Sequence, residues 1–181
     1  MTLQNFQQHC LEHLPLDLYF HNDEPEPGNT NITTKRTYKE SYVSYFLKRE
    51  EYERENASTT NFFEDTLQVN FNVFNRILEL LLIDLSSGMK IELIIKGYTS
   101  PLYDFEYNQK LSQRRISSAI NYIVQFKNGE FKKYISSEKL IIKQLPFGET
   151  KSSEDILGMM KGLRVRHFCA PLTVCKVGRA A

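Results

Sequence analysis

The sequence predicts a mixed α/β domain of the two-layer α+β type, in which a sheet is backed by helices on one face. The length of 181 residues suits one domain of ordinary size. Hydrophobic residues make up 41% of the chain and charged residues 25%, which excludes collagen-like, low-complexity and wholly disordered chains. The hydrophobic periods follow the order strand, helix, helix, strand, helix, strand, and a helix-covered sheet satisfies that order.

The first half of the chain predicts one strand and two helices. Leu16–Phe20 alternates apolar and polar residues, as a half-buried strand does. Residues 21–36 are rich in Asn, Asp, Pro, Gly and Thr and predict a loop. Helical spacing follows over Tyr38–Glu55 and is clearest over Phe62–Leu85, where apolar residues recur every three or four positions. Gly88 is well placed to cap this second helix.

The second half predicts two strands around one helix. Lys90–Tyr98 and Lys139–Leu145 are strand-like and lie between glycines and prolines, and Phe105–Phe126 has helical spacing. We expect the segments Leu16–Phe20, Lys90–Lys96 and Lys139–Leu145 to share one sheet, so that residues 14–150 form the domain.

The two ends of the chain are set apart from this domain. Residues 1–13 predict a short helical lead-in. Residues 151–181 hold two of the three cysteines and show little periodicity, although Leu163–Phe168 and Leu172–Val177 have the composition of short strands. Because the tail has few periodic apolar positions, we expect it to add little to stability.

Composition and motifs exclude several classes of protein. The three cysteines form neither a disulfide framework nor a CxxC metal knuckle. The sequence holds no P-loop, GxGxxG or GxSxG motif, so we expect no catalytic residues, cofactor or metal. The acidic residues Asp23, Glu24 and Glu26 are of the type that binds a cation, but the prolines between them favour a stiff loop.

Targeting signals are equally sparse. The amino terminus lacks a basic region followed by an apolar run, and no window approaches the ~20 apolar residues of a membrane helix. The chain therefore works in the cytosol or is a piece of a longer exported protein. Residues 1–90 hold 8 Lys and Arg against 14 Asp and Glu, and residues 91–181 hold 15 against 8. Such a split fits a polyanion-binding half or two mutually attracting faces, and no aromatic–basic motif predicts nucleic-acid binding.

The candidate site lies where the second strand meets the third helix. Asn108, Leu111, Ser112 and Arg115 are spaced at i, i+3, i+4 and i+7 and share one helical face toward the loop Tyr98–Ser100. A helix start, backbone N–H groups and a forked guanidinium together make a carboxylate receptor. The alternative is that Arg115 ties the loop to the helix through structural hydrogen bonds.

These residues resemble a known signature. The block G-Y-T-S followed by N-x-x-L-S-x-x-R is similar to G-H-T-D and N-x-x-L-S-x-x-R-A of the OmpA-like peptidoglycan-binding domain, with the same spacing. Residues 14–25 and 139–150 resemble the first and third strands of a divergent branch, so the resemblance covers roughly residues 14–150. The matching positions are Gly97, Thr99, Asn108, Leu111, Ser112 and Arg115.

The resemblance implies a βαβαβ fold with a mixed sheet and a non-catalytic role. Such domains hold the outer membrane of Gram-negative cells to peptidoglycan by gripping its diaminopimelate. The resemblance then implies peptidoglycan as the partner, with other envelope proteins as further candidates, and a place on the periplasmic face of the outer membrane. Export would depend on an amino-terminal part missing from this chain. The implied ligand-binding residues are Thr99, Ser100, Asn108, Leu111, Ser112 and Arg115.

The chain departs from the family in two places. Ser100 replaces the family's Asp, and a charge-assisted contact is worth about 1.5–3 kcal/mol, or roughly ten- to hundredfold in affinity. Residues 151–181 do not match the family's last strand, because they have diverged or come from a shifted reading frame. Two alternatives stay open: an OmpA-like scaffold that serves protein–protein contacts without wall binding, and an unrelated cytosolic enzyme or nucleic-acid binder.

Overall fold

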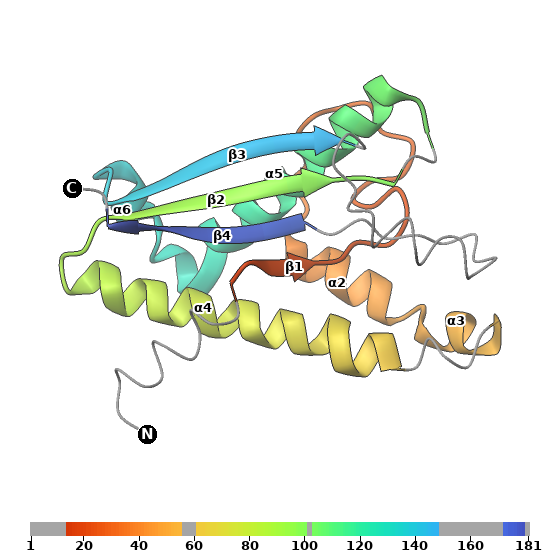
Figure 1. Ribbon diagram of the computed structural model, residues 1–181, viewed down its shortest axis with the longest axis horizontal. Helices are drawn as coiled ribbons and strands as arrows, with labels where there is room; N and C mark the ends of the chain where they lie inside the picture. The colour runs from red at the N-terminus through yellow and green to blue at the C-terminus, as the bar shows by residue number, and fades with distance from the viewer. Residues whose placement is uncertain (1–13, 56–60, 101–102, 149–171, 180–181) are drawn as a thin grey trace.

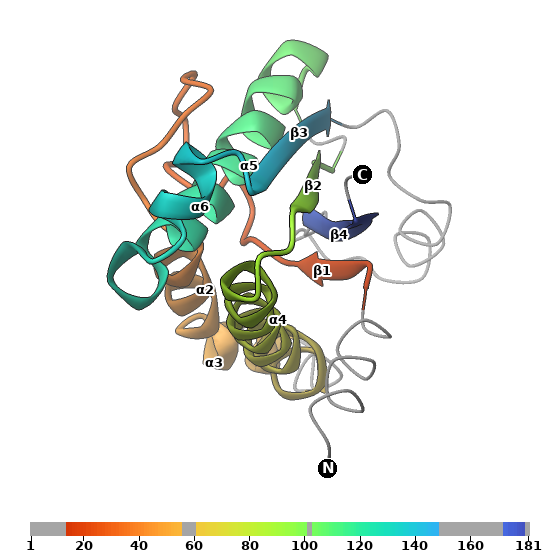
Figure 2. The same cartoon turned by 90° about the vertical axis from the view of Figure 1, so that its left-hand side faces the viewer.

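The computed structural model describes residues 14–55, 61–100 and 103–148, together with the backbone of residues 172–179. The predicted lead-in, residues 1–13, and the predicted strand Leu163–Phe168 lie outside the described residues. Helices gather on one face of a four-stranded sheet (Figures 1 and 2). The predicted class, a mixed helix-and-strand fold with helices on one face, is confirmed.

The strands are β1 (Leu16–Leu18), β2 (Ile91–Tyr98), β3 (Leu140–Gly148) and β4 (Leu172–Arg179), in the sheet order β1-β4-β2-β3. The three predicted strands therefore share a sheet, as expected. β2 and β3 are parallel, and β4 is antiparallel to both β1 and β2. It follows that β1, β2 and β3 run in the same direction, so their carboxyl ends meet at one end of the sheet.

The tail, which we expected to add little to stability, contributes a strand to the sheet. β4 lies between β1 and β2 and pairs with both, with Val174 opposite Leu16 on one side and Ile95 on the other. The strand expected at Leu172–Val177 is confirmed and extends to Arg179, so the predicted boundary at residue 150 cuts through the sheet. The hydrogen bonds between strands are made by backbone N–H and C=O groups, and every residue except proline supplies both. A central strand can therefore form without a clear apolar period in its sequence.

The helices follow the predicted order with three differences in detail. The expected helix Tyr38–Glu55 is two helices, and the expected helix Phe105–Phe126 continues past a kink where Lys127 and Asn128 have φ of 45° and 61°. The short helix after this kink was not predicted. The helical segments are α2 (Tyr38–Phe46), α3 (Arg49–Glu55), the π-helical η2 (Phe62–Gln68), α4 (Val69–Ser86), α5 (Phe105–Gly129) and α6 (Lys132–Ser136).

Local chemistry sets the ends of three helices. Thr37 and Glu40 form a capping box at the start of α2, and Asp104 accepts a hydrogen bond from the N–H of Tyr107 at the start of α5. At the end of α4, Gly88 has a φ of 93° and its N–H bonds to the carbonyl of Leu85. This is the predicted glycine cap.

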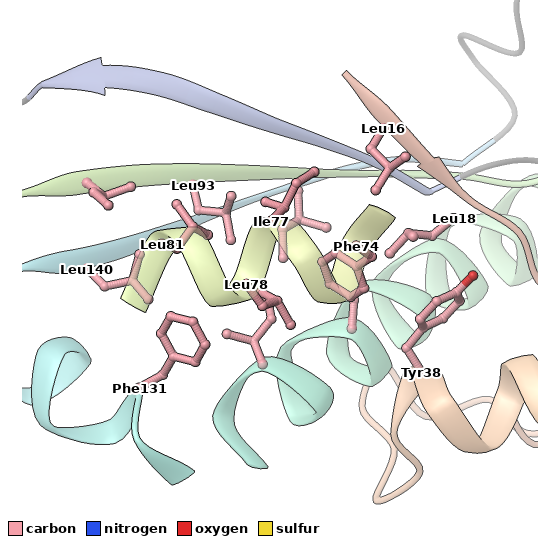
Figure 3. Close-up of a cluster of buried hydrophobic side chains, with 14 of the residues drawn as sticks. Leu16, Leu18, Tyr38, Phe74, Ile77, Leu78, Leu81, Leu93, Phe131 and Leu140 are labelled. Atoms are coloured by element: carbon pink, nitrogen blue, oxygen red, sulfur yellow. The ribbon is translucent and has the colours of Figure 1, made fainter. Parts of the chain in front are cut away.

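The core lies between the sheet and the helices. Figure 3 shows Leu16, Leu18 and Leu93 of the sheet pointing toward Phe74 and Leu78 of α4. The apolar stripe predicted on Phe62–Leu85 is largely buried, and α5 closes the remaining part of the same face. This packing presses the amino-terminal half of α5 against the carboxyl end of β2, where the predicted site lies.

Candidate functional site

Three segments meet at the carboxyl ends of the parallel-running strands. They are the β1–α2 loop (residues 19–37), the connection from β2 to α5, and the end of β3. The N–H of Thr99 bonds to the carbonyl of Gly148 at 2.9 Å, which joins two of these segments. Open α/β sheets commonly bind ligands outside the carboxyl ends of their strands. The predicted site is therefore in a place suited to binding.

Two glycines allow α5 to approach the strands closely. A Cβ on Gly97 would lie 2.6 Å from the carbonyl oxygen of Ser112, and one on Gly148 would lie 2.7 Å from the side-chain oxygen of Gln109. The amide nitrogen of Gln109 also donates to the carbonyl of Pro146 at 2.9 Å. Any larger residue at Gly97 would push α5 away from β2.

The predicted site residues are brought to this end of the sheet, and all of them are buried. The side-chain nitrogen of Asn108 donates to the carbonyl of Tyr103 at 2.9 Å, and the hydroxyl of Ser112 donates to the carbonyl of Gln109 at 2.8 Å. Within the described part of the chain, the hydroxyl of Thr99 has no hydrogen-bond partner. The six buried residues are Thr99, Ser100, Asn108, Leu111, Ser112 and Arg115.

The guanidinium of Arg115 donates hydrogen bonds to main-chain carbonyls. Nε donates to the carbonyl of Glu24 at 3.1 Å, Nη1 to that of Tyr98 at 2.9 Å, and Nη2 to that of His21 at 3.5 Å. The guanidinium carbon also lies 5.4 Å from the ring centroid of Phe20. These contacts show the structural tie that the sequence left open as an alternative. That Arg115 also holds a ligand carboxylate stays a prediction.

Arg114 makes a second tie that sequence reasoning missed. Its side chain is fully buried, and it donates to the carbonyls of Pro25 at 2.8 Å and Asn31 at 2.9 Å. Adjacent residues of a helix point about 100° apart, so Arg114 and Arg115 reach different parts of the same loop. Two successive arginines in an otherwise core-facing helix were the available signal.

A half-buried polar cluster supports Arg114. The hydroxyl of Tyr107 donates to Asp23, whose other carboxylate oxygen accepts from the N–H of Gly28 at 2.7 Å, and Nη2 of Arg114 lies 3.4 Å from the Tyr107 oxygen. Burial, followed by the hydrogen bond to Asp23, raises the pKa of Tyr107. The phenol therefore remains a neutral donor and holds the loop to α5.

The acidic residues of the loop bond within the protein. Glu24 pairs with Arg36 at 3.2 Å, and Glu26 accepts from the hydroxyl of Thr34 at 2.9 Å and from the amide of Asn29 at 2.8 Å. Across the described ranges, no group of three or more His, Cys, Asp or Glu side chains is arranged to hold a metal ion. Nor does any described helix have the length and apolar character needed to cross a membrane.

No family model, no curated protein and no solved structure matches the chain.

Proposed function

We propose that the chain is a non-catalytic cell-envelope domain with an OmpA-like βαβαβ fold that binds peptidoglycan through the carboxylate of diaminopimelate. It would thereby anchor the outer membrane, or a protein of that membrane, on its periplasmic face. The observation that carries the proposal is the meeting of Thr99, Ser100 and Arg115 at the carboxyl end of β2. It supports a carboxylate receptor because two buried hydroxyls directly follow Tyr98, whose carbonyl accepts from the Arg115 guanidinium at 2.9 Å.

The contacts of Arg115 suggest how a carboxylate enters. Among the bonds of Arg115 to described residues, the Nη2 bond to His21 is the longest at 3.5 Å, and charge-assisted bonds to a carboxylate are shorter and stronger than this. A ligand would therefore replace this bond first and leave the bonds to Glu24 and Tyr98 in place. The hydroxyl of Thr99, which lacks a partner among the described residues, is available to donate to the same carboxylate.

Ser100 makes weak binding the expected outcome. Diaminopimelate carries an ammonium beside its carboxylate, and a serine hydroxyl offers that ammonium no opposite charge. Ser100→Asp would supply it, next to the cationic Arg115. We therefore expect measurable but weak binding by the wild type and tighter binding by Ser100→Asp.

Sedimentation with purified peptidoglycan sacculi tests the proposal. The variants are Ser100→Asp, Thr99→Val and a control, Ser137→Asp, which adds the same charge at an exposed position before β3 at the other end of the sheet. We expect more Ser100→Asp than wild type in the pellet, less Thr99→Val, and no change for Ser137→Asp. If neither the wild type nor Ser100→Asp pellets with sacculi while both are folded, the proposal is wrong.

A second candidate is an OmpA-like scaffold that serves protein–protein contacts without wall binding. Two observations favour it: Ser100 supplies no charge, and Arg115 already donates to three main-chain carbonyls. This candidate predicts the negative sedimentation result for every variant. The same experiment therefore separates the two functions.

A further inference from the structure

Two aromatic side chains stand out on the surface beside the candidate site. Tyr103 is 48% exposed and Phe105 is 57% exposed. Among the described residues they are the exposed large aromatics, whereas the other exposed large hydrophobic residues are aliphatic. Exposed aromatic surface forgoes the stabilisation that burial would give, so two exposed rings near one site indicate a contact surface.

Contacts with α5 hold Tyr103 in place. Asn108, one of the predicted site residues, donates to the carbonyl of Tyr103, and the ring of Tyr103 lies 5.0 Å from that of Tyr107. Asp104, between the two aromatics, caps α5 through the N–H of Tyr107. A surface fixed in this way pays little ordering entropy when it binds.

The pair also lies within reach of the carboxylate receptor. Tyr103 follows Ser100 by three residues, and three residues of extended chain span at most about 11 Å. A ligand held at Ser100 therefore meets the ring of Tyr103 if it continues by this distance toward the start of α5, where Phe105 is the first residue of the helix.

We propose that Tyr103 and Phe105 pack against the sugar rings of the glycan strand to which the bound stem peptide is attached. This inference rests on the proposed function. A pyranose ring presents C–H groups on its faces and hydroxyls on its edge, so an exposed aromatic ring covers the apolar face while water keeps the hydroxyls. The domain would then read two parts of one ligand: diaminopimelate at the receptor and the sugar at the aromatic pair.

Calorimetry with two soluble probes tests the inference. One probe is the diaminopimelate-containing stem tripeptide, and the other is the same tripeptide joined to its disaccharide. The variant Tyr103→Ala with Phe105→Ala is compared with a control, Val43→Ala with Leu47→Ala, which removes exposed aliphatic side chains on and just after α2.

We expect the wild type and the control to bind the disaccharide-bearing probe about tenfold more tightly than the bare peptide. The aromatic double variant should lose this difference and keep its affinity for the bare peptide. Equal affinity of the wild type for both probes, or an equal loss of both affinities in the double variant, would overturn the inference and leave the proposed function standing.

Failure of the proposed function is recognised separately. If the bare tripeptide binds neither the wild type nor Ser100→Asp, the peptide-free disaccharide is titrated at millimolar concentration and the ring signals of Tyr103 and Phe105 are followed by NMR. Sugar-dependent shifts at these rings support the aromatic contact, and their absence contradicts it.

Discussion

The amino-terminal half of α5 builds two neighbouring regions of opposite character. The base of the site consists of Arg114 and Arg115, which are buried and donate to carbonyls of the β1–α2 loop. The rim consists of Ser100, Tyr103 and Phe105, of which the two aromatics are exposed. The comparison teaches that the buried charge of the base first serves the fold, with Arg115 also offering its guanidinium to the proposed carboxylate, and that the rim adjusts the affinity. Substitutions in the base should therefore cost stability, and those in the rim should change binding.

The largest expected effect comes from removing the strand that joins the two sides of the base. β4 connects β1, which leads into the loop, to β2, which leads to the rim. Deletion of residues 172–181 leaves β1 without the strand with which it pairs, so we expect the truncated chain to lose its cooperative thermal unfolding transition. Thermal unfolding followed by circular dichroism measures this. A melting temperature within a few degrees of the full chain would show that the sheet does not need β4.

Next in size is the contrast between base and rim in stability. Arg115→Lys should lower the free energy of unfolding by about 3–5 kcal/mol, because an ammonium cannot satisfy carbonyls on three sides and remains buried. Phe105→Ala should change it by less than about 0.5 kcal/mol, since the ring is mostly exposed. Urea denaturation of both variants tests the contrast. Similar losses in the two variants would contradict the division into base and rim.

A smaller loss is expected where the helix touches the strand. Gly97→Ala places a methyl group 2.6 Å from the carbonyl of Ser112, in a contact made by backbone on both sides. Overpacking of this kind costs about 1–3 kcal/mol. Urea denaturation measures the loss, and a crystal structure of the variant should show α5 displaced from β2. An unchanged stability would mean that α5 moves freely and does not hold the base.

The smallest effect concerns the far end of the loop that the base holds. The pKa of Glu40 lies below its ordinary value of 4.5, because the hydroxyl of Thr37 and then its backbone N–H donate to the carboxylate. A lowered folded-state pKa adds stability that is present above the ordinary value and is lost as pH falls through the lowered one. The free energy of unfolding of the wild type should therefore exceed that of Glu40→Gln by less than about 1 kcal/mol at pH 7. Urea denaturation at a series of pH values should show this difference vanishing in acid. A difference that grows toward low pH would reverse the assigned sign.

Much of the fold could be predicted because its signals are local. The apolar stripe of Phe62–Leu85, the alternation in Ile91–Tyr98 and the shared face of Asn108 and Arg115 all depend on residues close in sequence. The position of β4 could not be predicted, since it depends on backbone pairing with strands far away along the chain. The split of the helix after Phe46 left no comparable local signal.

The candidate site could likewise be predicted only where its signals are local in sequence. The shared face of Asn108, Leu111, Ser112 and Arg115 follows from helical spacing. The acceptors of Arg115, in contrast, lie 91 residues away at Glu24 and 94 residues away at His21. The ties of Arg114 to Pro25 and Asn31 are equally remote in sequence. Contacts of this kind depend on how a loop folds over a helix, and no period in the sequence encodes them.

The central claim is that a diaminopimelate carboxylate binds beside Arg115 and that Ser100 limits its affinity. Calorimetric titration of the stem tripeptide into the wild type and Ser100→Asp tests it most directly, with thermal unfolding used to show that both are folded. We predict that Ser100→Asp binds roughly ten- to hundredfold more tightly, because the new carboxylate faces the ligand ammonium. An affinity that is unchanged or weaker in the folded variant would contradict the claim.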